Sequence, residues 1–437
     1  MKRLLLITER FSPDVGGLAR SATRLVGTLC QLGVAVDVVT WSRYLQPGEV
    51  LPPESIDGKS RVYRIGLYRN WDMTMPHTLN VLEWLHSCWH YDAVWGHYVF
   101  PSGFLATWFG GMQGIPSTVS ARGNDIDKEM FPPGDFARLQ WTLQQTQVIT
   151  AVSADMSRKI QLLSGRDDVL VLKNAVDTEI FAPQSIICGV QTSQITPLNP
   201  PFPRGEISNL SSLPLERGGL GWGNKSDTIN GVYTVESAVG KINKESLGIA
   251  PEEVVLGFCG ELREKKGQQF LLNALTTVRN QRPACLLIIG EVRASQESVL
   301  QVYATQYPEH AQRIIMTGHL PDIQAVAAHL QLCDVYLQPS LWEGMPNALL
   351  EAMACGCCCI ASDAGGITEV ITHGEDGFIL PRSQLHKLGE AVLECLTMPS
   401  TIKSQITQAA RDRILKEYSI PQEQQRLQIV LDRLLKN

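Results

Sequence analysis

The sequence predicts an α/β protein built from two doubly wound, Rossmann-like domains, each with a mainly parallel sheet. Short apolar runs typical of buried strands alternate with helix-length segments through residues 1–183 and again from residue 246. A proline- and glycine-rich stretch, residues 184–245, separates the two series. The length of 437 residues also allows two or three hydrophobic cores.

In the first series we expect a strand at residues 4–7, a helix at 18–32 and a strand at 34–40. Further strands are expected at residues 93–95, 117–120 and 148–152. The start of the chain resembles a signal peptide only briefly, because charge returns after residue 7. Strands separated by helices indicate parallel βαβ units, so residues 1–183 are predicted to form one domain.

Residues 184–245 are interpreted as an insertion or linker without regular structure, because proline and glycine at this density preclude a helix or central strand. An inert loop is favoured over a flap that binds an acceptor or partner. In the second domain, residues 246–415, strands are expected at 254–258, 286–289, 314–317, 335–337 and 358–361. Residues 416–437 carry helical apolar spacing and predict a final amphipathic helix.

Composition excludes several classes of protein. A net charge of −6 argues against a nucleic-acid binder, which normally carries a basic excess. No apolar run approaches the length of a membrane span.

Four of the eleven cysteines cluster at positions 355, 357, 358 and 359. Neighbouring side chains of a strand point to opposite faces and no histidine stands at zinc-type spacing, so these are expected to be small buried residues rather than metal ligands. Free cysteines fit a reducing, cytoplasmic setting.

The most informative segment spans residues 339–356 and reads Pro-Ser-Leu-Trp-Glu343-Gly-Met-Pro-Asn-Ala-Leu-Leu-Glu351-Ala-Met-Ala-Cys-Gly. It predicts a strand, a tight loop and a helix, with Glu343 in the loop and Glu351 about two turns further on. Unpaired amides at such a helix start suit a phosphate, and carboxylates can bind hydroxyls. This combination describes a site for a sugar nucleotide, although acidic residues near a helix start are also common for structural reasons.

Together with the glycine turn at residues 365–366 and the turn at 376–377, this segment resembles the retaining glycosyltransferases of the GT-B fold, family four, also called glycosyl transferases group 1. The resemblance covers residues 1–183 and about 245–420 and is densest from 339 to 381. It implies two domains facing across a cleft, a nucleotide-sugar donor held mainly by the second, and an acceptor held mainly by the first. It also implies a metal-independent reaction without a cofactor, and a last helix that crosses back to the first domain.

By this resemblance, Glu343 would hold the hydroxyls of the transferred sugar and Glu351 those of the ribose. The donor would also contact the backbone around the helix start, at Gly344, Met345, Pro346 and Asn347. The cations expected at the diphosphate are Lys266 and Arg263, which follow a predicted strand. Glu261 stands where relatives carry arginine, and Arg263 points the same way in an extended segment, so it is the expected substitute. A solvated basic loop is the alternative.

Candidates in the first domain rest on shorter motifs. Gly16 and Gly17 precede the first long helix and allow close approach of a phosphate, although a plain loop connection fits equally well. His97 and Asp125 follow predicted strands and are assigned to the acceptor side; for His97 a hydrogen-bonded structural role is slightly favoured. Arg122 stands where many relatives carry histidine. It stays protonated, so it would bind the donor or an anionic acceptor, or pair with Asp125.

We therefore expect a nucleotide sugar and a glycan or lipid-linked acceptor as ligands, and neither metal nor nucleic acid. Contact with the inner face of a membrane is common among such relatives, but Arg20 and Arg24 on one helix face are too few to establish it. Two alternatives stay open: a UDP-sugar epimerase of the same fold, and a non-catalytic donor-binding partner of another transferase. A dinucleotide oxidoreductase is disfavoured because no strand is followed by G-x-G-x-x-G.

Overall fold

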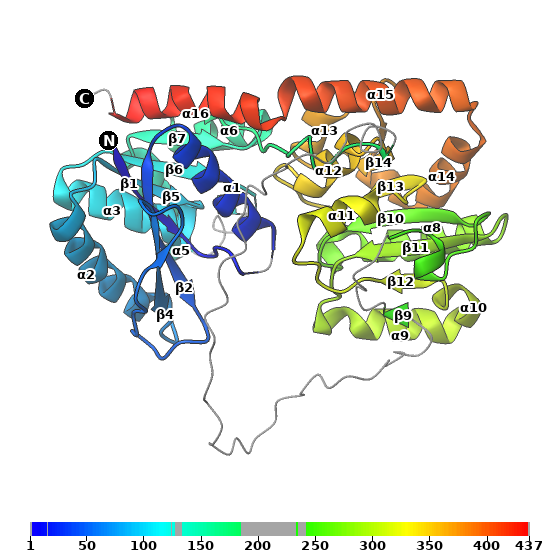
Figure 1. The fold of residues 1–437 in the computed structure, drawn as a ribbon, viewed down its shortest axis with the longest axis horizontal. Coiled ribbons are helices and arrows are strands. Elements are labelled where there is room, and N and C mark those ends of the chain that lie inside the picture. Colours follow the sequence, from blue (N-terminus) through cyan, green and yellow to red (C-terminus); the bar gives the residue numbers. More distant parts are fainter. Residues whose placement is uncertain are drawn as a thin grey trace, which may run out of the picture.

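A computed structural model describes residues 2–14, 16–123, 125–126, 133–184, 233–234 and 242–435 of the chain. These residues form two α/β domains side by side, with the N-terminal domain in blue and cyan and the C-terminal domain in green and yellow (Figure 1). Two long helices, α15 (Ser400–Glu417) and α16 (Ile420–Leu435), run along one side of both domains.

The N-terminal sheet has the strand order β3-β4-β2-β1-β5-β6-β7-β8, and all neighbours pair in parallel except β3 with β4. Its central strands are buried because helices cover both faces, as expected for parallel sheets. The strands are β1 (Arg3–Thr8), β2 (Ala35–Ser42), β3 (Glu54–Ser55), β4 (Arg61–Gly66), β5 (Ala93–His97), β6 (Ser117–Ala121), β7 (Val148–Ala151) and β8 (Leu170–Val171). The helices are α1 (Gly17–Gln31), α2 (Trp71–Trp89), α3 (Phe104–Gln113), α5 (Pro133–Gln145) and α6 (Ala154–Ser164).

The C-terminal sheet has the order β15-β14-β13-β10-β11-β12-β9 and is parallel throughout. The strands are β9 (Tyr233–Thr234), β10 (Val254–Cys259), β11 (Ala284–Ile289), β12 (Ile314–Met316), β13 (Val335–Gln338), β14 (Cys358–Ser362) and β15 (Phe378–Leu380). The helices are α8 (Gln268–Arg279), α9 (Glu297–Gln306), α10 (Pro308–Ala311), α11 (Ile323–Leu330), α12 (Asn347–Ala354), α13 (Ile367–Val370) and α14 (Leu388–Thr397).

Helix α16 belongs to the core of the N-terminal domain although it is the last helix of the chain. Its residues Leu427, Val430 and Leu434 are buried in one cluster with Leu4 of β1 and Leu25 of α1. Its acidic residue adds to this packing, because Glu423 is fully buried against Arg24 at 3.1 Å and accepts a hydrogen bond from Thr28. The final helix therefore ties the C-terminal domain to the N-terminal one.

The strand pattern predicted from apolar runs agrees with the central strands of both sheets and misses five outer ones, β3, β4, β8, β9 and β15. β4 was not predicted, because its sequence RVYRIG places arginine between apolar residues, yet helices cover it and it is largely buried. β8 is a two-residue strand within the apolar run of residues 169–172, which was not interpreted as a strand. β9 falls inside the predicted insertion and pairs with β12; the rest of residues 185–241 lies outside the described residues. The four clustered cysteines are buried with free thiols, as predicted.

Candidate functional site

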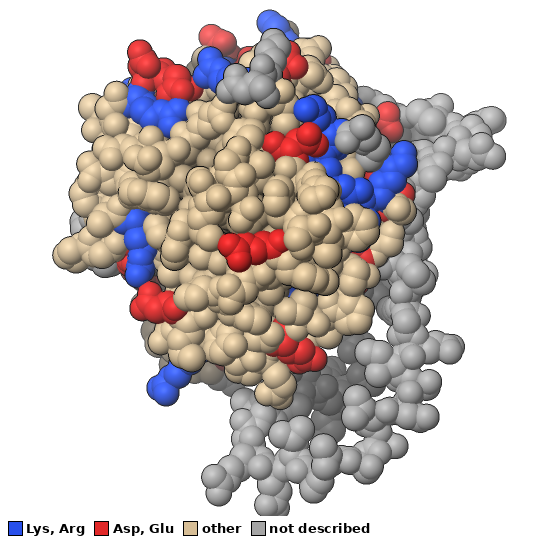
Figure 2. Space-filling view, turned by 90° about the vertical axis from the view of Figure 1, so that its left-hand side faces the viewer, with Lys and Arg blue, Asp and Glu red and all other residues tan. Residues whose placement is uncertain are grey.

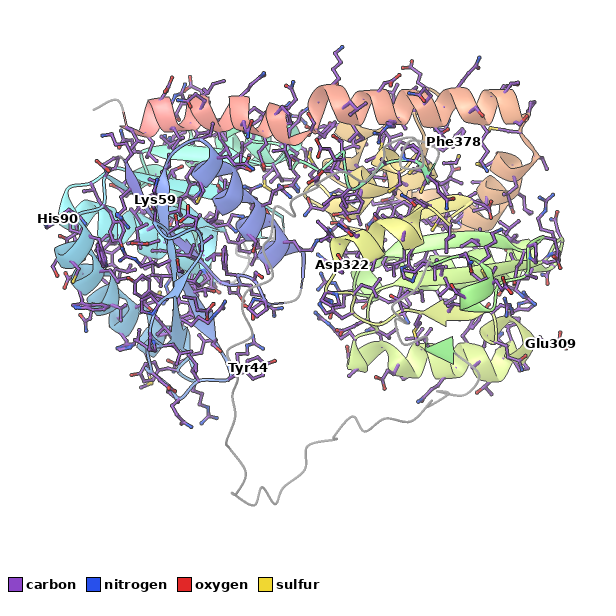
Figure 3. All side chains as sticks on the ribbon, viewed as in Figure 1. Tyr44, Lys59, His90, Glu309, Asp322 and Phe378 are labelled. Carbon is purple, nitrogen blue, oxygen red and sulfur yellow. The ribbon has the colours of Figure 1, made fainter. Side chains whose placement is uncertain are left out.

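The candidate residues lie in loops at the carboxyl ends of parallel strands. Parallel strands bring these ends to one edge of each sheet, which is where open α/β sheets bind ligands. The loops that concern us follow β1, β5 and β6 in one domain and β10, β13 and β14 in the other. Side chains from α1 and from the facing edge of the C-terminal domain occupy the space between the two ribbons, where Asp322 is labelled at the start of α11 (Figure 3).

Glu343 and Lys266 form an ion pair at the edge of the C-terminal domain that faces the N-terminal domain, which we call the C-terminal edge. The Oε1 atom of Glu343 accepts hydrogen bonds from Lys266 Nζ and from Ser340 Oγ at 2.8 Å. Burial acts to raise the pKa of Glu343, but Lys266 and Lys265 outweigh it, and the pKa is lowered. Because these donors share Oε1, the second oxygen of an ionised Glu343 is left for other hydrogen bonds.

The loop that carries Lys266 is packed directly against the loop that carries Glu343. Gly267 has a φ of +79°, and a Cβ at this position would lie 2.0 Å from the carbonyl oxygen of Pro339. Only glycine fits there. The amide of Leu341 also donates to the carbonyl of Lys265 at 2.8 Å. Burial lowers the pKa of Lys265 to about 8, so a second cation of reduced basicity stands beside the pair.

The start of α12 is pressed against the N-terminal domain. A Cβ on Gly344 would lie 2.7 Å from the carbonyl oxygen of Arg122, so the two backbones touch without room for a side chain. The carbonyl of Met345 accepts a hydrogen bond from Asn174 at 2.7 Å, and Pro346 immediately precedes the first helical residue. The Oδ1 atom of Asn347 is buried and has no partner among the described residues. The helix start thus presents amides and an open acceptor at the domain interface.

Glu351 lies about one turn beyond Asn347 on α12 and forms an ion pair with the N-terminal domain. Its Oε1 atom accepts a hydrogen bond from Arg20 Nη2 of α1. Its Oε2 atom is buried and has no partner in the described part of the chain. Arg20 is therefore engaged in an ion pair although its side chain is 38% exposed, and Arg24, which is more buried, pairs with Glu423.

Arg122 is buried at the edge of the N-terminal domain that faces the C-terminal domain, which we call the N-terminal edge. Two of its side-chain nitrogens have no hydrogen-bond partner among the described residues. Its Nη1 atom donates to Asn174 Oδ1 at 2.9 Å, while Nε and Nη2 find no partner among the described residues. Burial, reinforced by Arg24, lowers the pKa of Arg122 to about 10, so the side chain is still a cation at neutral pH. Sequence reasoning missed Asn174, which links Arg122 to Met345 across the interface.

Asp125 does not lie on the acceptor side as predicted. Its carboxylate is fully buried and accepts hydrogen bonds from the amides of Val99 at 3.2 Å, Arg122 at 3.1 Å and Gly123 at 2.9 Å. Burial raises its pKa. The alternative ion pair with the Arg122 guanidinium is not formed either, because that group contacts Asn174. Asp125 holds two loops together.

His97 is also enclosed rather than open to the cleft. The ring is fully buried, with Nε2 3.2 Å from Ser21 Oγ and Nδ1 3.5 Å from Thr8 Oγ1. Burial, together with Arg122 and Arg24, keeps its pKa well below the usual value, so the imidazole is neutral. The structural role that the sequence slightly favoured is the one the contacts support.

Two further predicted groups remain accessible. Gly16 has a φ of +123°, and a Cβ on Gly17 would meet nothing within 4 Å, so this backbone is open at the start of α1. Arg263 lies 3.4 Å from Glu261, as its side-chain direction predicted. Glu261 is also held by Arg293 at 2.8 Å, a residue of the loop after β11 that sequence reasoning missed. The negative charge of Glu261, which stands where relatives carry arginine, is therefore paired with two arginines.

The interface also contains a polar cavity of about 380 Å³ that reaches Glu343. Its walls come from α6 and from the loops after β13, β14 and β15, and include Arg158, Trp342 and Arg382. Glu369 closes one side, because its carboxylate accepts from the first amides of α6, at Ala154 and Asp155, both at 2.9 Å. A hollow of about 480 Å³ lies at the opposite, amino-terminal edge of the C-terminal sheet, away from these residues.

Comparison with known families agrees with this arrangement. A sequence model described as "Glycosyl transferases group 1" matches residues 253–398, and one described as "Glycosyl transferase 4-like domain" matches residues 16–175. Together they account for well over half of the chain. The chain belongs to the group 1 glycosyltransferases. Its fold is GT-B, as the resemblance implied.

Individual relatives of this glycosyltransferase match over shorter stretches. A D-inositol 3-phosphate glycosyltransferase of Jonesia denitrificans is 29% identical over 140 residues, 31% of this chain and 33% of that protein. A GDP-mannose-dependent monoacylated alpha-(1-6)-phosphatidylinositol monomannoside mannosyltransferase of Corynebacterium glutamicum is 32% identical over 164 residues, 36% of this chain and 41% of that protein. The chain thus matches a third to two fifths of the length of these relatives.

Solved structures match this glycosyltransferase along its whole length. The Anabaena protein HepE, in complex with UDP and glucose, superposes with a TM-score of 0.70 at 14% identity, covering 99% of this chain and 100% of that one. At this identity the likeness concerns the fold alone.

Proposed function

We propose that this glycosyltransferase moves a hexose from a nucleotide-sugar donor to a glycan or lipid-linked acceptor, with retention of the anomeric configuration and without a metal or cofactor. The observation that carries the proposal is the Lys266–Glu343 pair beside the start of α12. It combines a cation for a diphosphate, amides for its oxygens and a carboxylate for sugar hydroxyls at one place. The named donor of the Corynebacterium relative, GDP-mannose, is a ligand of this class.

In the proposed reaction, Lys266 and Arg263 stabilise the charge that develops on the diphosphate as the bond from the anomeric carbon to the phosphate oxygen breaks. Lys266 exchanges Glu343 for phosphate, and Glu343 then holds sugar hydroxyls. The acceptor hydroxyl attacks from the face that the diphosphate leaves, and its proton passes to the departing phosphate. Arg122, with two unused nitrogens, contacts the transferred sugar or the phosphate. Removing one such stabilising donor slows an enzyme by about 100- to 1,000-fold.

The acceptor is expected to approach from the N-terminal edge. Tyr44 follows β2 at this edge, is 96% exposed, and lies on the side of its domain that faces the C-terminal domain (Figure 3). Sequence reasoning missed it because it lies in no motif.

A membrane contact is also part of the proposal. The face in Figure 2 is largely uncharged, and α2 and α3 expose Trp84, Trp108 and Met112 on the outside of the N-terminal domain. Exposed tryptophan on a face with only scattered charges (Figure 2) suits the bilayer interface. No helix within the described ranges is long and apolar enough to cross a membrane. Ten described cysteines with free thiols support a reducing, cytoplasmic location.

A thermal-shift screen with UDP, GDP and ADP, followed by donor hydrolysis with the matching sugar nucleotides, tests the function. We expect one base to raise the Tm of the wild-type protein, because a ligand that binds the native state stabilises it by mass action. Slow release of free sugar is expected as well. Lys266→Ala should abolish both effects, whereas Lys416→Ala, on the exposed face of α15, should change neither.

The three outcomes separate the candidate functions. Binding with release of the sugar in its original anomeric form supports the transferase. Binding with no turnover favours the non-catalytic partner, which the acidic Glu261 would suit. An altered sugar on an intact nucleotide would identify an epimerase.

A further inference from the structure

The two oxygens of Glu351 are in different states. Oε1 accepts the hydrogen bond from Arg20, whereas Oε2 is buried without a partner among the described residues. The residue as a whole is 5% exposed. A buried polar atom left unpaired is unfavourable, so Oε2 is prepared for a hydrogen-bond donor. A ribose hydroxyl is such a donor, whereas a phosphate is not.

Arg20 is suited to orient this carboxylate. A guanidinium carries only donors, so Arg20 occupies Oε1 through Nη2 and cannot itself accept a hydrogen bond from a ligand. Arg20 is in the first turn of α1, where its amide donates to the carbonyl of Gly16 at 3.1 Å. Its position is therefore set by the glycine loop at the start of the helix. With Oε1 occupied, Oε2 is the oxygen left to accept from a ligand.

The pair also joins the two domains. Arg20 belongs to α1 of the N-terminal domain and Glu351 to α12 of the C-terminal domain, 331 positions away in the sequence. A donor held by the C-terminal domain alone would meet a carboxylate that is free to turn. The carboxylate is fixed only when the two domains lie as they do here.

We propose that Arg20 is a positioning residue for the donor ribose: it holds Oε1 of Glu351, so that Oε2 accepts from a ribose hydroxyl, and it makes ribose recognition depend on the contact between the two domains. This inference rests on the proposed function, because it requires a nucleotide donor at Glu351. Arg20 remains paired with Glu351 when the nucleotide is bound.

The experiment compares a ribonucleoside diphosphate with its 2′-deoxy and 3′-deoxy analogues by calorimetry, using whichever of UDP, GDP and ADP binds the wild-type protein. We expect the wild type to bind at least one deoxy analogue about 10-fold more weakly or worse, since a hydrogen bond to a charged group is lost. Arg20→Ala should weaken the ribonucleotide by a similar factor and leave the deoxy analogue nearly unchanged. The preference for ribose should therefore largely disappear.

Three controls keep the result interpretable. Arg20→Lys, which keeps a cationic donor on a different side chain, should restore part of the preference. Lys173→Ala removes another ion pair of the domain junction, to Glu417 at 2.9 Å, and should leave the preference intact. In steady-state assays with a donor, Arg20→Ala should raise the donor KM far more than it lowers kcat.

The proposal is overturned if Arg20→Ala binds the ribonucleotide as tightly as the wild type or more tightly, because Arg20 would then be a competitor of the ribose or a simple clasp. A full preference for ribose in Arg20→Ala would overturn it equally. If the wild type binds none of the three nucleotides, it is the proposed function that fails.

Discussion

The two facing sheet edges use their polar residues in different ways. At the C-terminal edge, Glu351 keeps a buried oxygen unpaired and Glu343 is held only through Oε1. At the N-terminal edge, His97 and Asp125 are fully enclosed and bonded to neighbouring strands and loops. The comparison teaches that polar residues near the ends of similar strands keep unused hydrogen-bonding atoms on one edge and are taken up by contacts within the domain on the other.

Two arginines of the N-terminal domain, unlike His97 and Asp125, either contact the C-terminal domain or keep nitrogens without a partner among the described residues. Arg20 reaches Glu351, and the Nε and Nη2 atoms of Arg122 have no partner among the described residues. The N-terminal domain therefore contributes cations to the shared site, while its histidine and aspartate stabilise the loops that carry them. Substitutions on the two edges should accordingly separate activity from stability.

The largest effect is expected for Glu343→Gln. This change removes the charge that holds Lys266 and the carboxylate assigned to the sugar hydroxyls, so kcat/KM for the donor should fall by about 100- to 1,000-fold. The side chain keeps its size, but Lys266 loses its counter-charge in a largely buried setting, so a moderate fall in Tm should accompany the loss of activity. Initial rates and a thermal melt on the same preparation measure both quantities. A variant with near wild-type rates would mean that the C-terminal edge is architectural too, and the contrast between the edges would disappear.

The opposite pattern is expected for Asp125→Ala. Three backbone amides lose their acceptor inside the protein, and unpaired buried donors are unfavourable by about 1–3 kcal/mol each before relaxation. After partial relaxation we expect the free energy of unfolding to fall by about 2–4 kcal/mol in urea titrations. Nucleotide affinity, measured at a temperature where the variant is folded, should stay within a few-fold of the wild type. A large loss of affinity with unchanged stability would return Asp125 to the ligand site.

The same contrast explains what could be predicted from the sequence. Glu343 and Glu351 were identifiable because strand, loop and helix follow one another within a single short segment, and local geometry places both side chains. The partners of these residues were not identifiable in this way. Arg20 meets Glu351 across 331 positions, and Asn174 meets Met345 across 171, so only the packing of the two domains brings them together. Enclosure of His97 likewise depends on α1 covering the end of β5.

The smallest effect concerns pH and Lys265. Burial lowers the pKa of Lys265 to about 8, below its ordinary value near 10.4, so between these values the unfolded chain binds more protons and stability rises with pH. Donor binding should show the opposite sign, because a diphosphate favours the protonated lysine. We expect the Kd of the nucleoside diphosphate to rise by about 3- to 5-fold between about pH 7.5 and pH 8.8, a range above the pKa of the phosphate and below that of the base. In Lys265→Arg the side chain stays charged, so calorimetry over the same range should give a flat profile. Identical profiles for the two proteins would place Lys265 outside the field of the donor and confine the cationic part of this edge to Lys266 and Arg263.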